Sequence, residues 1–409
     1  MNRLLIIAMA LLMVGLTACA RKKPYPKPPA YVPHPQNEFP ITASYAFTLP
    51  FMTDEEFEWV KEAGFNTITQ RLSTQDFDTL LSRAGSHGII VACSQEALLD
   101  PSTIGGVLER YKDNPVVWGF SMIDEPKASQ FPRLRQLNDS VVKIAPNQNA
   151  FFNLLPAMSS EHLGTPDYRS YVEEYVRTVN PPYISYDIYP VKIDKKGKVY
   201  VDPALYRTIE VIRDVSMASG RPFWSYILCN EHWMYPEPTE QNIRFQVFTA
   251  LAYGAQGLKY YTYQLPEYDR TTREYSNGPL DWDGNRTATW YMVRNVNREV
   301  RCLSDVFLGS EVVSVTQTGA EIPDGTKRNH NLPRPFLGIE SFGRGVTVSH
   351  LKKGNAQFLL LVNRDVENSQ RIRLSRAREV IRRYGDGTSK RDFDPYLTLE
   401  PGGYALFQF

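Results

Sequence analysis

The sequence predicts an α/β protein: a (β/α)8 TIM barrel followed by a C-terminal antiparallel β-sandwich. Between residues 41 and 309, eight short apolar runs alternate with amphipathic stretches, and the runs begin about 31 residues apart on average. This is the length of one strand-helix-strand unit. Eight such units favour a closed barrel over an open sheet. After residue 309 the runs become shorter and are separated by Gly, Asn, Asp and Pro, which is typical of a small β-sandwich.

The eight runs predict the barrel strands, and helical signals fill the gaps between them. Thr53-Asp54-Glu55-Glu56 is a capping box that opens a helix, and Gly64 ends that helix. Apolar residues recur at helical spacing over 168–179, 205–218 and 242–253. The strand runs are 41–47, 67–72, 89–94, 116–123, 150–155, 183–189, 223–228 and 258–263.

The predicted sandwich occupies residues 310–409. It contains no converging group of acids, histidines or cysteines, so we expect it to have a packing role. Carbohydrate binding by this region is the alternative, and no residue pattern in the sequence supports it. Its predicted strands are the runs 346–350, 357–362, 370–374, 396–399 and 404–409.

Composition excludes several functional classes. The 46 basic and 45 acidic residues give a net charge of +1, so the chain offers no basic stripe for nucleic acid. A hydrophobic content of 42% excludes wholesale disorder. The sequence has no GxGxxG, GxxxxGK[ST] or GxSxG motif, and its six histidines never occur at HxH or HExxH spacing. We therefore expect no cofactor and no metal.

The N-terminus predicts export and a lipid anchor. Residues 1–18 have a positive start and an apolar run too short to span a bilayer, as in a secretory signal peptide. Leu16-Thr17-Ala18-Cys19 resembles a bacterial lipobox, which implies lipidation of Cys19 and anchoring in the cell envelope. The alternative is a plain signal peptide with a chance cysteine. The sequence does not indicate which membrane leaflet holds the anchor, or whether the protein faces the periplasm or the cell surface.

The segment 19–40 contains seven prolines after Arg21-Lys22-Lys23. Proline at this density predicts a semi-rigid tether that holds the barrel off the membrane. Three further cysteines, Cys93, Cys229 and Cys302, show no metal-site spacing, and we expect free thiols. A bridge from Cys229 to Cys93 or Cys302 remains an alternative.

In a TIM barrel, reactive groups project from the C-terminal ends of the strands. The fourth run ends in Asp124-Glu125-Pro126, which places at least one carboxylate at the barrel mouth, unless Asp124 caps the next helix and Glu125 is solvated. The sixth run carries Asp187. If it is buried, Asp187 needs a partner and would orient another group, bind a sugar hydroxyl or form a structural ion pair.

The seventh run is followed by Asn230-Glu231-His232-Trp233, which supplies a later acid in the loop above the strand. The eighth run ends in Tyr260-Tyr261-Thr262-Tyr263. Aromatic side chains at strand ends suit stacking on the faces of sugars, and ordinary barrel packing is the alternative reading.

Four motifs resemble the retaining glycoside hydrolases of the large barrel clan, most closely the family 42 β-galactosidases and lipoprotein relatives from gut Bacteroidota. The resemblance covers roughly residues 41–305. The motifs are Trp118 to Pro126, Arg221 to Tyr226, Ala250 to Tyr263, and Asp281 to Thr287 together with Val296 to Glu299.

The resemblance implies that Glu125 is the acid/base. The family commonly has Asn where this chain has Asp124, which can still accept a hydrogen bond from the sugar 2-hydroxyl and whose charge raises the pKa of Glu125. Ile227 stands where the resemblance places the nucleophile. Glu231 would need a bend to come within about 5–5.5 Å of Glu125, whereas about 6.5–9.5 Å would indicate inversion. Asp187 and Glu267 are the fallback acids.

The sequence thus predicts a lipid-anchored glycosidase that cleaves an oligo- or polysaccharide with two carboxylates, Glu125 and Glu231, and with retention. The alternative is a non-catalytic surface glycan-binding lipoprotein on a degenerate barrel, favoured by Ile227. The sugar, linkage, endo or exo action and oligomeric state stay open. The expected substrate contacts are Asp124, Tyr186, Asp187, Trp224, Trp233, Tyr261 and Tyr263.

Overall fold

The computed structural model describes residues 23–47 and 51–409, so the predicted signal peptide and Cys19 lie outside it. The predicted TIM barrel is confirmed, and each of its eight parallel strands falls on one of the eight apolar runs. The strands are β1 (Ile41–Ser44), β2 (Thr67–Arg71), β3 (Ile90–Ser94), β4 (Val117–Asp124), β5 (Asn149–Asn153), β6 (Ile184–Tyr186), β9 (Phe223–Leu228) and β11 (Leu258–Tyr261).

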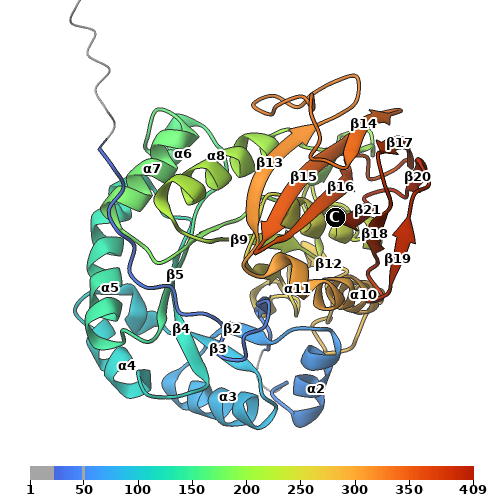
Figure 1. The fold of residues 1–409 in the computed structure, drawn as a ribbon. Helices are drawn as coiled ribbons and strands as arrows, with labels where there is room; N and C mark the ends of the chain where they lie inside the picture. Colours follow the sequence, from blue (N-terminus) through green and yellow to red (C-terminus); the bar gives the residue numbers. More distant parts are fainter. Residues whose placement is uncertain (1–22, 48–50) are drawn as a thin grey trace, which may run out of the picture.

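Hydrogen bonds run through the strand order β5-β4-β3-β2-β1-β11-β9-β6. The Leu154 amide donates to the Ser185 carbonyl at 2.9 Å and joins the two outer strands, which closes the ring. Helices surround the ring, as Figure 1 shows. They are α2 (Asp54–Glu62), α3 (Thr74–Ser86), α4 (Ile104–Tyr111), α5 (Phe131–Ile144), α6 (Ser160–Leu163), α7 (Tyr168–Thr178), α8 (Ala204–Ser219), α9 (Glu240–Ala252), α10 (Ala288–Cys302) and α11 (Ser304–Phe307). Thr53 and Glu56 form the predicted capping box at the start of α2.

Alternation along each strand separates two buried layers. On β9, Phe223 and Ile227 face the helices and join the main core, whereas Trp224 faces the barrel lumen. The lumen is closed at the N-terminal ends of the strands by an aromatic cluster, within which Trp118 and Trp224 have ring centroids 5.2 Å apart. The cluster consists of Ile90, Ala92, Trp118, Phe151, Tyr183 and Trp224.

The proline-rich segment packs against this closed end of the barrel, and Figure 1 shows its blue trace crossing there. Tyr31 and Val32 cover the aromatic cluster. The Trp118 indole donates to the Val32 carbonyl at 3.0 Å, and the Asn149 side chain bonds both the amide and the carbonyl of Val32. The tether prediction therefore differs from the structure over residues 24–36, which form a fixed strap because aromatic and amide groups of the barrel bind them.

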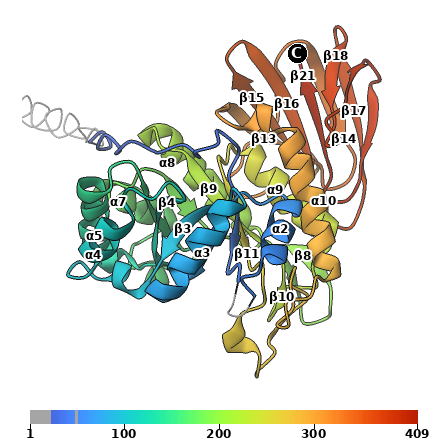
Figure 2. The same ribbon diagram turned by 90° about the horizontal axis from the view of Figure 1, so that it is seen from below.

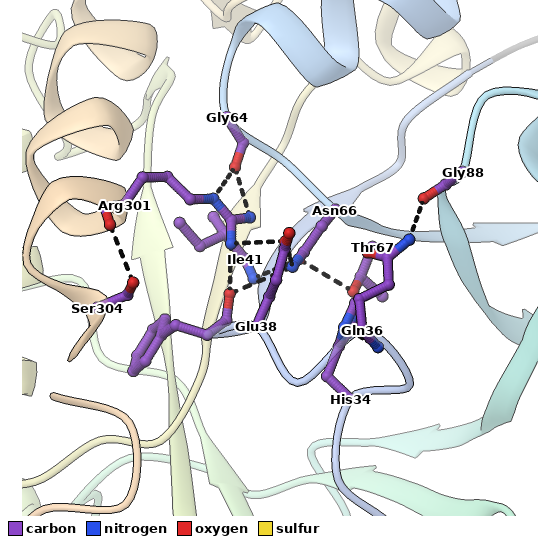
Figure 3. Close-up of polar contacts among 11 residues, drawn as sticks. His34, Gln36, Glu38, Ile41, Gly64, Asn66, Thr67, Gly88, Arg301 and Ser304 are labelled. Atoms are coloured by element: carbon purple, nitrogen blue, oxygen red, sulfur yellow. Dashed lines mark hydrogen bonds and ion pairs between the residues drawn. The ribbon is translucent and has the colours of Figure 1, made fainter.

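A second set of contacts holds the end of the strap (Figure 3). Arg301 on α10 donates to the carbonyls of Gly64 and Phe39 and to the Glu38 carboxylate. The Asn66 amide donates to Glu38 at 2.9 Å and accepts from the Ile41 amide at 3.0 Å. Arg301 thus ties the last barrel helix to the chain that enters β1.

The C-terminal region forms the predicted sandwich, with four strands that the pattern did not indicate. Two of them precede the first predicted run, and two lie between the runs 370–374 and 396–399. Strands β13 (Glu311–Gln317), β15 (Val346–Lys353), β16 (Ala356–Asn363), β21 (Tyr404–Gln408), β18 (Val380–Arg383) and β19 (Ser389–Asp392) form one sheet. Strands β14 (Phe336–Ser341), β17 (Gln370–Arg376) and β20 (Tyr396–Leu399) form the other. Phe248 of α9 stacks on Tyr404 at 3.5 Å and joins the larger sheet to the barrel. Figure 2 shows the sandwich lying beside α9 and α10.

Two further expectations concern the thiols and the membrane. Cys93, Cys229 and Cys302 are free thiols, so neither alternative bridge forms. Among the described residues, no helix combines the length and apolar character that a bilayer crossing requires.

Replacing Arg301 by Ala should lower the free energy of unfolding by about 2 kcal/mol, because the Glu38 carboxylate and two carbonyls lose a charged donor. Urea denaturation followed by circular dichroism would measure the change. Arg298→Ala, an exposed position on the same helix, is the matched control and should change it by less than about 0.5 kcal/mol. Equal effects for the two variants would contradict the role given to Arg301.

Candidate active site

Two carboxylates stand at the C-terminal end of β4. Asp124 is the last residue of the strand, and Glu125 follows with a φ of 48°, in the left-handed region that non-glycine residues rarely adopt. The Glu125 amide donates to the Asn153 carbonyl at 2.9 Å and so holds this conformation. Strained backbone of this kind is concentrated at functional sites. Both side chains are exposed at the barrel mouth.

Asn153, at the end of β5, connects the acids of neighbouring strands. Its side-chain Nδ2 donates to the carboxylates of Asp124 and Asp187 at 3.1 Å each. Its side-chain Oδ1 accepts from the Ser185 hydroxyl at 2.9 Å. The three strands are adjacent and parallel, so their ends meet at one edge of the barrel. Asn153 was not predicted as a site residue, although it is a polar residue within the apolar fifth run.

Asp187 is buried and forms a hydrogen bond with Glu125. Two carboxyl groups bond directly only when one carries a proton. Burial, together with the charges of Glu125 and Asp124, raises the pKa of Asp187 well above its usual range. Desolvation and the charge of Asp124 also raise the pKa of Glu125.

A pocket of about 70 Å³ at this end of the lumen is lined by Asp124, Tyr226 and Lys259, among other residues. Lys259 is buried, and its ammonium lies 5.2 Å from the Phe151 ring and 5.3 Å from the Tyr226 ring. Burial lowers the pKa of Lys259 to about 8, and the charge of Asp124 opposes that shift. Conversely, desolvation raises the pKa of Asp124, while Asn153, Lys259 and Arg71 act in the opposite direction.

Aromatic side chains form a wall beside the carboxylates. Tyr261 stacks on Tyr189 at 6.0 Å and meets Tyr45 edge-on at 5.6 Å, and its hydroxyl lies 3.3 Å from that of Tyr275. The wall continues to Trp233 and Tyr268, each 68% exposed. Tyr261 and Trp233 were predicted as sugar contacts, and both lie on this wall.

Glu231 lies in a separate hairpin. Strand β10 (Glu231–His232) pairs with β12 (Tyr275–Ser276). The Glu231 carboxylate accepts from the Ser276 hydroxyl at 2.9 Å and from the Asn277 amide at 2.7 Å. Within residues 23–47 and 51–409, its hydrogen bonds go to these two residues, whereas Asp187 is the acid in contact with Glu125. Glu267 is also engaged elsewhere, with Arg270 at 2.7 Å.

Three predicted sugar contacts lie in the core, away from the mouth. Tyr186 faces the helices and packs on Phe223, because alternation on β6 turns Ser185 inward instead. Tyr263 is buried, and its hydroxyl accepts from the Trp290 indole at 3.1 Å. Trp224 belongs to the aromatic cluster at the opposite end of the lumen. Their aromatic character reflects packing.

Ile227 also faces the helices, so the side chain at this position points away from the lumen. The lumen position beside it is Tyr226, which lines the pocket with Asp124 and Lys259. Among the described residues, no group of three or more His, Cys, Asp or Glu side chains is arranged to hold a metal ion.

No protein-family model matches the sequence, and no curated protein matches it either. Two solved structures share the whole architecture. A glycoside hydrolase family 5 protein from Bacteroides vulgatus is 13% identical with a TM-score of 0.57, over 93% of this chain and 91% of that one. A family 39 glycoside hydrolase from Bacteroides cellulosilyticus is 10% identical with a TM-score of 0.55, over 90% and 80%.

These identities establish a common fold. A β-galactosidase from Marinomonas is 10% identical with a TM-score of 0.49, and the match spans 65% of this chain and 60% of the length of that protein. The particular likeness to family 42 is a prediction from sequence motifs.

Replacing Asp187 by Asn should raise the free energy of unfolding relative to the wild type, and the gain should grow as pH rises. The folded state holds this carboxyl protonated above its unfolded pKa of about 3.9, so the stability it contributes is lost as pH rises through the folded pKa. Asn keeps the hydrogen bonds without the charge. We expect no difference at pH 4 and a gain of about 1 kcal/mol or more at pH 8, measured by urea denaturation. Asp113→Asn, at an exposed position, should show no such pH-dependent gain, and a gain at pH 4 as large as at pH 8 would contradict the assignment.

Proposed function

We propose that this protein is a glycoside hydrolase that acts on an oligo- or polysaccharide, with Glu125 as the general acid. The observation that carries this proposal is the meeting of Asp124, Glu125 and Asp187 at the mouth of a TIM barrel, beside an open pocket and an aromatic wall. The fold shared with the family 5 and family 39 glycoside hydrolases supports it.

Glu125 suits the role of acid because its pKa is raised, which keeps a proton available at higher pH than for an ordinary carboxyl. In the first half of the reaction, the bond between the anomeric carbon and the glycosidic oxygen breaks, and the Glu125 proton passes to that oxygen. In the second half, water adds to the anomeric carbon and returns a proton to Glu125.

The second carboxylate must face the positive charge that develops on the sugar. We assign this role to Asp124, because it lines the pocket and because Lys259 and Arg71 favour its charged form. Glu231, the acid predicted from the sequence, remains the competing assignment. To act, Glu231 would have to leave Ser276 and Asn277. Retention of configuration, as the sequence motifs imply, is part of the proposal.

The lipid anchor at Cys19 and a location in the cell envelope also belong to the proposal, and they rest on the lipobox-like sequence alone. A second candidate function is glycan binding without cleavage. It is favoured by one observation: β9, the seventh barrel strand, carries no carboxylate within Phe223–Leu228.

Glu125→Gln should reduce turnover of unactivated glycosides by about 10²- to 10⁴-fold, because the leaving oxygen loses its proton donor. Aryl glycosides with a dinitrophenolate leaving group need no such proton and should lose much less activity. Release of reducing sugar from a panel of glycans would be measured, with calorimetry to follow binding. Glu55→Gln, at an exposed helical position, is the control. A wild-type protein that binds glycans of the panel and cleaves none would establish the binding function instead.

Asp124→Asn and Glu231→Gln distinguish the two candidates for the second carboxylate. If Asp124 faces the anomeric carbon, Asp124→Asn should lower kcat by at least about 10²-fold, whereas Glu231→Gln should lower it by less than about 10-fold. Proton NMR of the first-formed anomer would report the stereochemistry on the same substrate. A larger loss of kcat in Glu231→Gln than in Asp124→Asn would assign the role of second carboxylate to Glu231.

A further inference from the structure

The smaller sheet of the sandwich has a face that no element of the described residues covers. The larger sheet packs one side on the barrel, through Leu360 and Leu406, and the other side on the smaller sheet, through Leu359 and Phe407. The smaller sheet buries Ile372, Leu374 and Leu399 in that second interface. Its opposite side therefore faces solvent, away from the barrel, as the red strands at the edge of Figure 2 show.

The strand register places the exposed residues in two rows across this face. In one row, Thr398 of β20 lies opposite Arg371 of β17, whose carbonyl accepts from the Phe342 amide at 3.2 Å. In the next row, Arg373 of β17 lies between Glu340 of β14 and Tyr396 of β20. We call the five residues Phe342, Arg371, Arg373, Tyr396 and Thr398 the outer-sheet surface.

Two aromatic rings stand at opposite corners of this surface. Phe342 is 63% exposed and Tyr396 is 65% exposed, which is unusual for large aromatic side chains. Both line one groove together with Arg371 and Thr398. From the spacing of strands and residues, their Cα atoms lie roughly 12 Å apart. Neither ring stacks on another ring of the described part of the chain.

Polar donors lie between the rings. The Arg373 guanidinium bonds Glu340 at 3.3 Å, which fixes its position. The Arg371 guanidinium has no hydrogen bond or ion pair to any residue of 23–47 or 51–409, so its donors are free for a ligand. The Thr398 hydroxyl lies beside it across the strand pair.

We propose that the outer-sheet surface is a second binding site, and that its ligand is a polysaccharide chain. Pyranose rings have apolar faces that stack on aromatic rings and hydroxyl or carboxylate edges that accept from guanidinium groups. Two separated rings with donors between them match successive units of such a chain better than they match the continuous apolar patch of a protein interface. The site is independent of the barrel chemistry, because it lies on the far side of the sandwich.

Affinity electrophoresis of the full mature chain in gels containing a soluble polysaccharide tests the site. Glu125→Gln would be the background, so that the polysaccharide is not cleaved. The gels would contain galactan, xylan, mannan or polygalacturonate. The polygalacturonate gels would be run with and without added salt, because salt weakens binding through carboxylates and leaves binding through hydroxyl groups largely unchanged. We expect retardation in at least one gel, and Phe342→Ala with Tyr396→Ala should weaken the apparent affinity by at least 10-fold.

Tyr291→Ala, which removes a partly exposed ring from barrel helix α10, is the matched control and should leave retardation unchanged. Retardation that the double variant retains would place binding at the barrel mouth and overturn the proposal. So would the absence of retardation in all four gels. A dimer in analytical ultracentrifugation that the double variant dissociates would assign the surface to a second copy of this chain instead. Wild-type cleavage of small glycosides is measured separately, so either proposal can fail alone.

Discussion

The arrangement of the barrel mouth depends on the requirement that buried carboxyl groups find hydrogen-bond partners. Asn153 meets this requirement for Asp187, and it also donates to the exposed Asp124 and accepts from Ser185. Strands β4, β5 and β6 are therefore linked by side chains as well as by backbone. Glu125 completes the network through Asp187. Three acids held this closely cannot all be charged, and the raised pKa values that follow are the property a general acid needs.

The lumen has different chemistry at its two ends. At the closed end, the rings of Trp118, Trp224 and Tyr183 pack under the strap. At the open end, Lys259 lines a pocket together with Asp124. A cation buried among aromatic rings and facing a cluster of acids balances part of their charge from inside the barrel. The barrel thus confines its reactive groups to one end.

The sequence was sufficient for the fold because each strand is an apolar run of the right length at a regular spacing. Asp124, Glu125 and Asp187 could be predicted for the same reason, since they end such runs. Tyr186, Trp224 and Tyr263 were expected at the mouth, but they lie in the core, because aromatic side chains serve packing as well as stacking and residue type alone does not distinguish the two. The role of Asn153 arises from contacts between three strands. The position of the strap arises from bonds to aromatic residues more than 80 residues away, such as the bond from Trp118 to Val32. Such long-range contacts leave no local pattern.

The strap also has a consequence for the order of folding. It is synthesised before the barrel, yet its partners come much later: Arg221 is 195 residues from Pro26, and Arg301 is 263 residues from Glu38. Such distant contacts form late, so the segment must remain extended and unpaired while the barrel assembles. Proline suits this interval, because it lacks the amide donor that strand pairing and aggregation require. The high proline content that predicted a tether therefore also suits a segment that binds the barrel only after the barrel has folded.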